Sequence, residues 1–210
     1  MGDAAKELRV VVFASGSGSN FESLAAYEPP VRLWRVVALV TNRAGVGATV
    51  RADRLGIPVR VVPTAGRTAE EVSGATLSAL SDLRADIVCL AGYLRLVPEA
   101  VIARFRGRIV NIHPALLPRF GGEGMYGIRI HRAVLEAGER VTGATVHHVT
   151  EEYDKGPVID REEVPVLEGD TPESLARRVL RVEHRLYPRT LDLLVRDLST
   201  NAASDLHIAK

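Results

Sequence analysis

The sequence has a single cysteine, no long apolar run and no excess of either charge, and each shortage excludes a class of protein. Cys89 is the only cysteine, so no internal disulfide can form, and a reducing compartment fits. The formal net charge is +1 and no basic stripe stands out, which argues against a nucleic-acid-binding protein. The apolar run 10–14 is too short for a signal peptide or a membrane span. We therefore expect a cytoplasmic protein that binds neither nucleic acid nor membrane.

Patterns that hold a metal ion are also missing. The six histidines include no His-Glu-x-x-His sequence, and there is one cysteine to join them. His147 and His148 are adjacent, so on a strand they would point to opposite faces and could not easily share an ion. The sequence therefore predicts no metal site.

The residues that are present suit one large α/β domain. The 210 residues, 46% of them apolar, are enough for a full hydrophobic core. We expect strands at 8–14, 35–41, 58–62, 86–91 and 108–112, alternating with helices from about 20 and at 44–55, 68–83, 98–105 and 128–137. This alternation predicts a three-layer sandwich with a mostly parallel central sheet, Rossmann-like in its amino-terminal part.

The last third of the chain has a different pattern. Strands expected at 142–149 and 158–164 are joined by a short link, which favours an antiparallel pair toward the carboxyl end. A long helix is predicted from 171 to about 195. Residues 1–7 and about 199–210 are predicted to be tails of this single domain, 1–210.

A glycine- and serine-rich loop, 15–20, lies between the first strand and the first helix. Glycines let backbone N–H groups approach an anion, and a helix N-terminus favours negative charge. Ser19 and Glu22 have the spacing of a capping box. The dinucleotide fingerprint fails because Phe21 stands at its third glycine position, and no Gly-Lys-Ser/Thr follows to make a P-loop. The loop thus favours one phosphate over NAD or ATP, although a tight turn with no ligand is the alternative.

Asn111 and His113 are two residues apart near the end of a strand, so both side chains point to the same face. Pro114 ends the strand and places the pair at its carboxyl end, on the side of loop 15–20. An amide can donate a hydrogen bond to a developing oxyanion, and an imidazolium can do the same or move a proton. A capping asparagine and a buried, hydrogen-bonded histidine fit the same residues.

The stretch 111–118, Asn-Ile-His-Pro-Ala-Leu-Leu-Pro, resembles the signature of the folate-dependent formyltransferases. Further segments resemble the glycinamide ribonucleotide branch of that family: 14–20, 90–96, 141–147, 154–159, and Glu183-His184 before Tyr187-Pro188. The match runs in order from about Arg9 to Leu194, nearly the whole chain, and this order makes it specific.

The resemblance implies transfer of a formyl group from 10-formyltetrahydrofolate to the amine of glycinamide ribonucleotide, in purine synthesis, through a tetrahedral intermediate. It implies an acceptor site in which Gly18, Ser19 and Asn20 bind the phosphate and Glu183 lies nearby. It implies a transfer centre formed by Asn111, His113 and Asp154. It also implies a folate pocket lined by Leu94, Arg95, Leu96 and Val97, with Arg67 approaching the folate. Asp154 would keep His113 protonated and help to relay a proton. The protein would be a monomer or a homodimer.

Two alternatives remain open: a hydrolase like formyltetrahydrofolate deformylase, and a non-catalytic nucleotide-binding module of the same fold. The deformylase carries a regulatory domain before this core and the methionyl-tRNA enzyme a domain after it, so the length favours the glycinamide ribonucleotide branch. The glycine-rich stretch 120–127 departs from the family's shorter pattern and predicts a lid over the site or a tolerated insertion. His131 matches a family histidine, but the sequence does not indicate its role.

Overall fold

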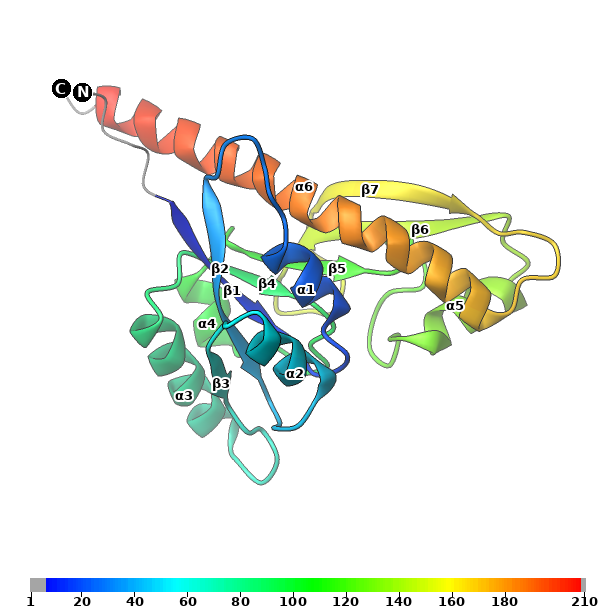
Figure 1. The fold of residues 1–210 in the computed structure, drawn as a ribbon, viewed down its shortest axis with the longest axis horizontal. Helices are drawn as coiled ribbons and strands as arrows, with labels where there is room; N and C mark the ends of the chain where they lie inside the picture. The colour runs from blue at the N-terminus through cyan, green and yellow to red at the C-terminus, as the bar shows by residue number, and fades with distance from the viewer. Residues whose placement is uncertain (1–6, 209–210) are drawn as a thin grey trace.

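A seven-stranded sheet forms the centre of the structure, a computed structural model that describes residues 7–208 (Figure 1). The strands are β1 (Leu8–Phe13), β2 (Trp34–Thr41), β3 (Val59–Val61), β4 (Ile87–Leu90), β5 (Ile109–His113), β6 (Val141–His148) and β7 (Val158–Pro165). Their order is β3-β2-β1-β4-β5-β6-β7, with β1 to β5 parallel, β6 antiparallel to β5, and β7 antiparallel to β6. The predicted α/β sandwich with a carboxyl-terminal antiparallel pair is confirmed.

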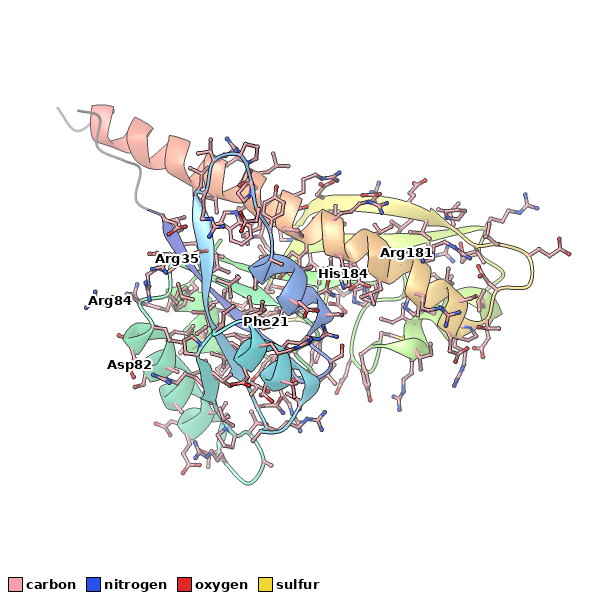
Figure 2. All side chains as sticks on the ribbon, viewed as in Figure 1. Phe21, Arg35, Asp82, Arg84, Arg181 and His184 are labelled. Atoms are coloured by element: carbon pink, nitrogen blue, oxygen red, sulfur yellow. The ribbon has the colours of Figure 1, made fainter. Side chains whose placement is uncertain are left out.

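Helices cover both faces of the sheet (Figure 1). They are α1 (Ser19–Ala25), α2 (Gly47–Arg54), α3 (Ala69–Asp82), α4 (Glu99–Arg104), α5 (Ile128–Glu136) and α6 (Pro172–Ile208). One hydrophobic cluster joins the sheet to α1, α2, α5 and α6, and a second joins it to α3 and α4. Phe21 points from α1 into the first cluster, whereas Arg84 and Arg181 lie at the surface (Figure 2).

Strand β1 shows how the sequence produces this layering. Val10 and Val12 pack into one cluster, while Val11 and Phe13 pack into the other. All four side chains are buried, as expected for a parallel strand covered on both faces.

Helix α6 is longer than predicted. It was expected to end near residue 195 but continues to Ile208, because no glycine or proline follows Pro188 to stop it. Residues 199–208, predicted to be part of a tail, are therefore helical, and residues 1–6 and 209–210 of the predicted tails lie outside the described part. No helix within residues 7–208 has the length and apolar character needed to cross a bilayer.

Tyr187 fixes α6 across the centre of the sheet. Its side chain is fully buried, and its hydroxyl lies 3.0 Å from the carbonyl oxygens of both Leu90 in β4 and Val110 in β5. This contact holds the middle of α6 against the strands whose ends carry the predicted site.

Candidate active site

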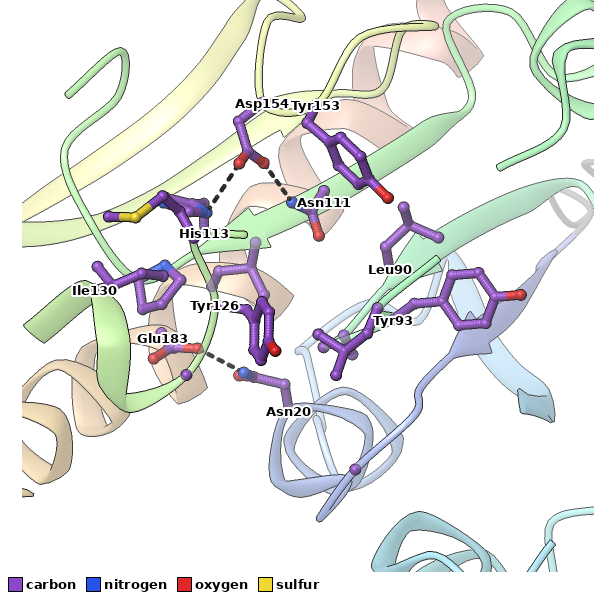
Figure 3. Close-up of a pocket in the computed structure, with 18 of the residues that line it drawn as sticks. Asn20, Leu90, Tyr93, Asn111, His113, Tyr126, Ile130, Tyr153, Asp154 and Glu183 are labelled. Carbon is purple, nitrogen blue, oxygen red and sulfur yellow. Dashed lines mark hydrogen bonds and ion pairs between the residues drawn. The ribbon is translucent and has the colours of Figure 1, made fainter. Parts of the chain in front are cut away.

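A cavity of about 770 Å³ lies where the loops after β1, β4, β5 and β6 meet α5 and α6 (Figure 3). Its lining includes every predicted site residue but one: Gly18, Ser19, Asn20, Leu94, Arg95, Leu96, Val97, Asn111, His113, Asp154 and Glu183. The exception is Arg67, which is exposed in the loop between β3 and α3 and does not line the cavity. Its contact with a folate stays a prediction.

Gly18 shapes the loop that enters α1. It has a φ of 78°, and an added Cβ would lie 2.5 Å from the Cα of Ala48 in α2, so both conformation and space require glycine. Gly18 is the N-cap of α1, with no side-chain capping bond. The predicted capping box of Ser19 and Glu22 is therefore wrong, because the Glu22 carboxylate pairs with Arg51 of α2 instead.

Asn20 and Glu183 meet in the cavity wall (Figure 3). Nδ2 of Asn20 donates to Oε2 of Glu183 at 2.6 Å, and both side chains are buried. Burial raises the pKa of Glu183 to about 7, although the Asn20 hydrogen bond acts to lower it. Oδ1 of Asn20 has no hydrogen-bond partner among the described residues. The Asn20 amide, which we predicted to bind the phosphate, thus donates one hydrogen bond to the Glu183 carboxyl group.

Asn111, His113 and Asp154 come together at the other end of the cavity (Figure 3). The first two lie on β5, and Asp154 lies in the turn between β6 and β7 with a φ of 56°. Oδ2 of Asp154 is 3.5 Å from Nδ1 of His113, and Oδ1 of Asp154 is 3.5 Å from Nδ2 of Asn111. The structure therefore gathers an amide, an imidazole and a carboxylate that the sequence separates.

The protonation of His113 differs from the prediction. Burial lowers the pKa of His113, and this effect exceeds the opposing influence of the Asp154 carboxylate and the Phe120 carbonyl. The contact of Oδ2 of Asp154 with the ring is long, 3.5 Å, whereas the same oxygen accepts a hydrogen bond of 2.9 Å from the backbone N–H of Gly122. Without a bound ligand the imidazole is thus mostly uncharged at neutral pH. The expectation that Asp154 keeps it protonated is wrong for this state.

Asp154 itself remains ionised. Its burial raises the carboxyl pKa, but the neighbouring His147 and His113 side chains and the Gly122 N–H together bring that pKa below its ordinary value. The site therefore presents a permanent negative charge beside a neutral base.

The glycine-rich segment 120–127 runs along the cavity and contacts this centre. Nε2 of His113 lies 2.8 Å from the carbonyl oxygen of Phe120, and Gly122 donates to Asp154. Tyr126 lines the cavity and packs under the guanidinium group of Arg129, 5.0 Å from the ring centre. The segment lies beside the site as predicted, and its movement as a lid stays a prediction.

Sequence patterns assigned no role at the site to several side chains that line this cavity. His147 is 2% exposed, and its Nε2 lies 3.0 Å from Nδ2 of Asn111, because β5 and β6 pair these two residues directly. Tyr153, next to Asp154 in the chain, lines the cavity, and burial raises the pKa of its hydroxyl group. His131 lines the cavity, and burial, with the nearby charge of His113, lowers its pKa to about 4. Only the antiparallel register of β5 and β6 could have indicated His147.

The predicted absence of a metal site stays a prediction. Within residues 7–208, no group of three or more His, Cys, Asp or Glu side chains is arranged to hold a metal ion. The chemistry available at the site is hydrogen bonding, proton transfer and electrostatic stabilisation.

Comparison with known proteins agrees with this geometry. The family model described as formyl transferase matches residues 8–191. A solved phosphoribosylglycinamide formyltransferase from Brucella melitensis is 44% identical, with a TM-score of 0.83, and the match covers 90% of this chain and 96% of that one.

Two plant proteins named phosphoribosylglycinamide formyltransferase, chloroplastic, are also similar. The one from Arabidopsis thaliana is 48% identical over 185 residues and the one from Vigna unguiculata 43% over 188, covering 85% and 89% of this chain. The chain spans 62% and 60% of the length of these relatives. The resemblance in the sequence motifs is thus confirmed over nearly the whole chain, which belongs to the formyl transferase family.

Proposed function

We propose that this protein transfers the formyl group of 10-formyltetrahydrofolate to the amine of 5′-phosphoribosylglycinamide, in the biosynthesis of purines. The proposal rests on the observation that the side chains of Asn111, His113 and Asp154 lie close together in one cavity. The names of its relatives support the same reaction. Formyl folate enters the proposal as a co-substrate, and no metal is required.

The acceptor would bind at the end of the cavity formed by Gly18, Ser19 and Asn20. The positive φ of Gly18 and its contact with α2 keep side chains away from the backbone there, which suits a phosphate. Glu183 borders the same space with a pKa of about 7, so near neutral pH its carboxyl group can donate or accept a hydrogen bond. Either form can meet a hydroxyl or amide of the acceptor.

The folate would bind against the loop after β4. Leu94 and Leu96 are 45% and 51% exposed beside the cavity, which leaves apolar surface for a flat heterocycle. The backbone N–H of Leu94 donates to Oγ of Ser15, which fixes this loop relative to β1. Arg95 and Val97 complete the predicted folate site.

The chemical step would use His113 as a base rather than as a preformed cation. Nε2 faces a carbonyl oxygen and so carries a hydrogen, which leaves Nδ1 as the basic atom. As the acceptor amine attacks the formyl carbon, Nδ1 would take up the proton that the amine releases. Asp154 would then stabilise the imidazolium, and the Asn111 amide would donate to the oxyanion. The proton would finally pass to the folate nitrogen that leaves.

Purified protein with both substrates tests the proposal in one assay. Formation of formylated acceptor together with tetrahydrofolate, detected by mass spectrometry, is expected. Folate hydrolysis without formylated acceptor would instead indicate a deformylase-like hydrolase, and binding without any turnover would indicate a non-catalytic module. The monomeric or homodimeric state and the cytoplasmic location stay predictions, and the two plant relatives are chloroplastic by name.

A further inference from the structure

The contacts of His147 determine which of its ring nitrogens carries the hydrogen. Nδ1 lies 2.8 Å from the carbonyl oxygen of His148, an atom that can only accept a hydrogen bond. Nδ1 must therefore carry the hydrogen. In the neutral ring Nε2 is then an acceptor. It lies 3.6 Å from Oδ1 of Asp154, to which it cannot donate, and closer to a group that can donate to it.

This acceptor faces the amide of Asn111. Nδ2 of Asn111 lies 3.0 Å from Nε2 of His147, so one amide N–H donates to the ring. A flipped amide would instead place its oxygen against a bare ring nitrogen and near the Asp154 carboxylate, an arrangement with no hydrogen to share. Two acceptors, Nε2 of His147 and Oδ1 of Asp154, thus select the same orientation of the amide.

The second N–H of that amide is held only weakly. Its contact with Oδ1 of Asp154 is 3.5 Å, the outer limit of a hydrogen bond, whereas the contact with His147 is 3.0 Å. A stronger acceptor entering the cavity, such as a developing oxyanion, could therefore take this hydrogen while the bond to His147 persists.

We infer that His147 is a positioning residue of the transfer centre, which orients the Asn111 amide so that one N–H is available to the oxyanion. The catalytic part of this inference rests on the proposed function. Its effect belongs to the transition state, because the oxyanion forms only there. Loss of His147 should therefore lower kcat and leave the KM of both substrates nearly unchanged.

The tautomer can be measured without any activity. Nitrogen-15 NMR of the histidine rings in the wild-type protein, at a pH where His147 is neutral, should show a hydrogen on Nδ1 of His147 and none on Nε2. A hydrogen on Nε2 would overturn the inference, because that nitrogen could not then accept from Asn111.

Variants test the consequence for turnover. His147→Phe keeps a ring but has no hydrogen-bond acceptor. Its kcat should fall about 10- to 100-fold, because an Asn111 amide that no longer points at the oxyanion stabilises it little. His147→Gln, whose amide oxygen can accept near the position of Nε2, should restore most of the rate. His148→Gln is the matched control on the same strand, because the His148 side chain does not line the cavity. Its kcat should equal that of the wild type.

Equal kcat values for wild type and His147→Phe would overturn the inference. If the Phe variant fails to fold, the Gln variant and the NMR tautomer decide, because a Gln variant that folds but keeps the full loss of kcat contradicts the role given to Nε2. A wild-type protein with the expected tautomer but no formyl transfer would contradict the proposed function and leave the orientation of Asn111 intact.

Discussion

Asn20 and Glu183, 163 residues apart in the chain, share a hydrogen bond of 2.6 Å from Nδ2 to Oε2 in the wall of the cavity. This bond joins the first turn of α1 to the middle of α6. It places a buried carboxyl group next to the loop that we propose binds phosphate. The two residues therefore affect both stability and acceptor binding.

Replacing Glu183 with Gln should make the protein more stable at high pH relative to the wild type. The pKa of Glu183 is raised to about 7, so between about pH 4.5 and 7 the folded protein binds a proton that the unfolded chain has released. Wild-type stability falls as pH rises through that window. The advantage of Glu183→Gln in the free energy of unfolding should grow by on the order of 3 kcal/mol from pH 4.5 to 8.

Urea denaturation at several pH values measures this difference. The control is Glu136→Gln, an exposed carboxylate at the end of α5. A gap between Glu183→Gln and wild type that is constant with pH would show that Glu183 is ionised in the folded protein throughout the window.

Asn20→Ala should weaken acceptor binding more than folate binding. A lost hydrogen bond to a charged group is worth about 1.5–3 kcal/mol, which predicts an increase of roughly 10- to 100-fold in the KM of the acceptor. The substitution also removes the hydrogen bond that lowers the pKa of Glu183, so that pKa should rise further. Steady-state kinetics with each substrate varied in turn provides the measurement, and an increase confined to the folate KM would show that the phosphate site is elsewhere.

Asp154→Asn should lower the pKa of His113 and slow turnover by about 100-fold or more, the scale of general acid–base contributions. The Asp154 carboxylate raises the pKa of His113, whereas burial lowers it. Removing the negative charge should therefore let that pKa fall. The new amide oxygen can still accept from the Gly122 N–H, so the loop should stay in place. The KM of both substrates should change little, since the loss lies in the transition state.

NMR titration of the His113 ring, in wild type and variant, accompanies the rate measurement. An unchanged pKa with near-normal turnover would mean that Asp154 serves the turn and not the proton transfer.

Deleting residues 122–126 should leave the fold intact and reduce kcat. These residues lie at the cavity rather than within a strand or helix, and the deletion removes the Gly122 N–H that binds Asp154. Thermal unfolding and steady-state kinetics of the shortened protein provide the check. Unchanged stability together with unchanged kinetics would exclude a role for this segment in the reaction.

Local patterns were sufficient to predict most of the fold. The strands predicted at 8–14 and 35–41 match β1 and β2, and the helix predicted at 68–83 matches α3, which begins with a Thr68–Glu71 capping box in which both reciprocal bonds are present. The spacing of Asn111 and His113 placed both on one face, which the cavity confirms. Each of these features depends on neighbours in sequence.

Features that depend on distant parts of the chain were missed. The direction of the His113 pKa shift follows from burial of the ring in the folded protein, and the contact of His147 with Asn111 follows from strand register. The cap at Gly18 depends on its approach to Ala48 in α2. None of these contacts can be read from spacing along a single segment.

The division of formyl groups between the acceptor and water tests the central claim most directly. Formylated acceptor and free formate are both measured after reaction of the purified protein with 10-formyltetrahydrofolate, with and without 5′-phosphoribosylglycinamide. The account predicts that nearly all formyl groups reach the acceptor when it is present and that the folate is stable when it is absent. Free formate as the main product in the presence of the acceptor would contradict it.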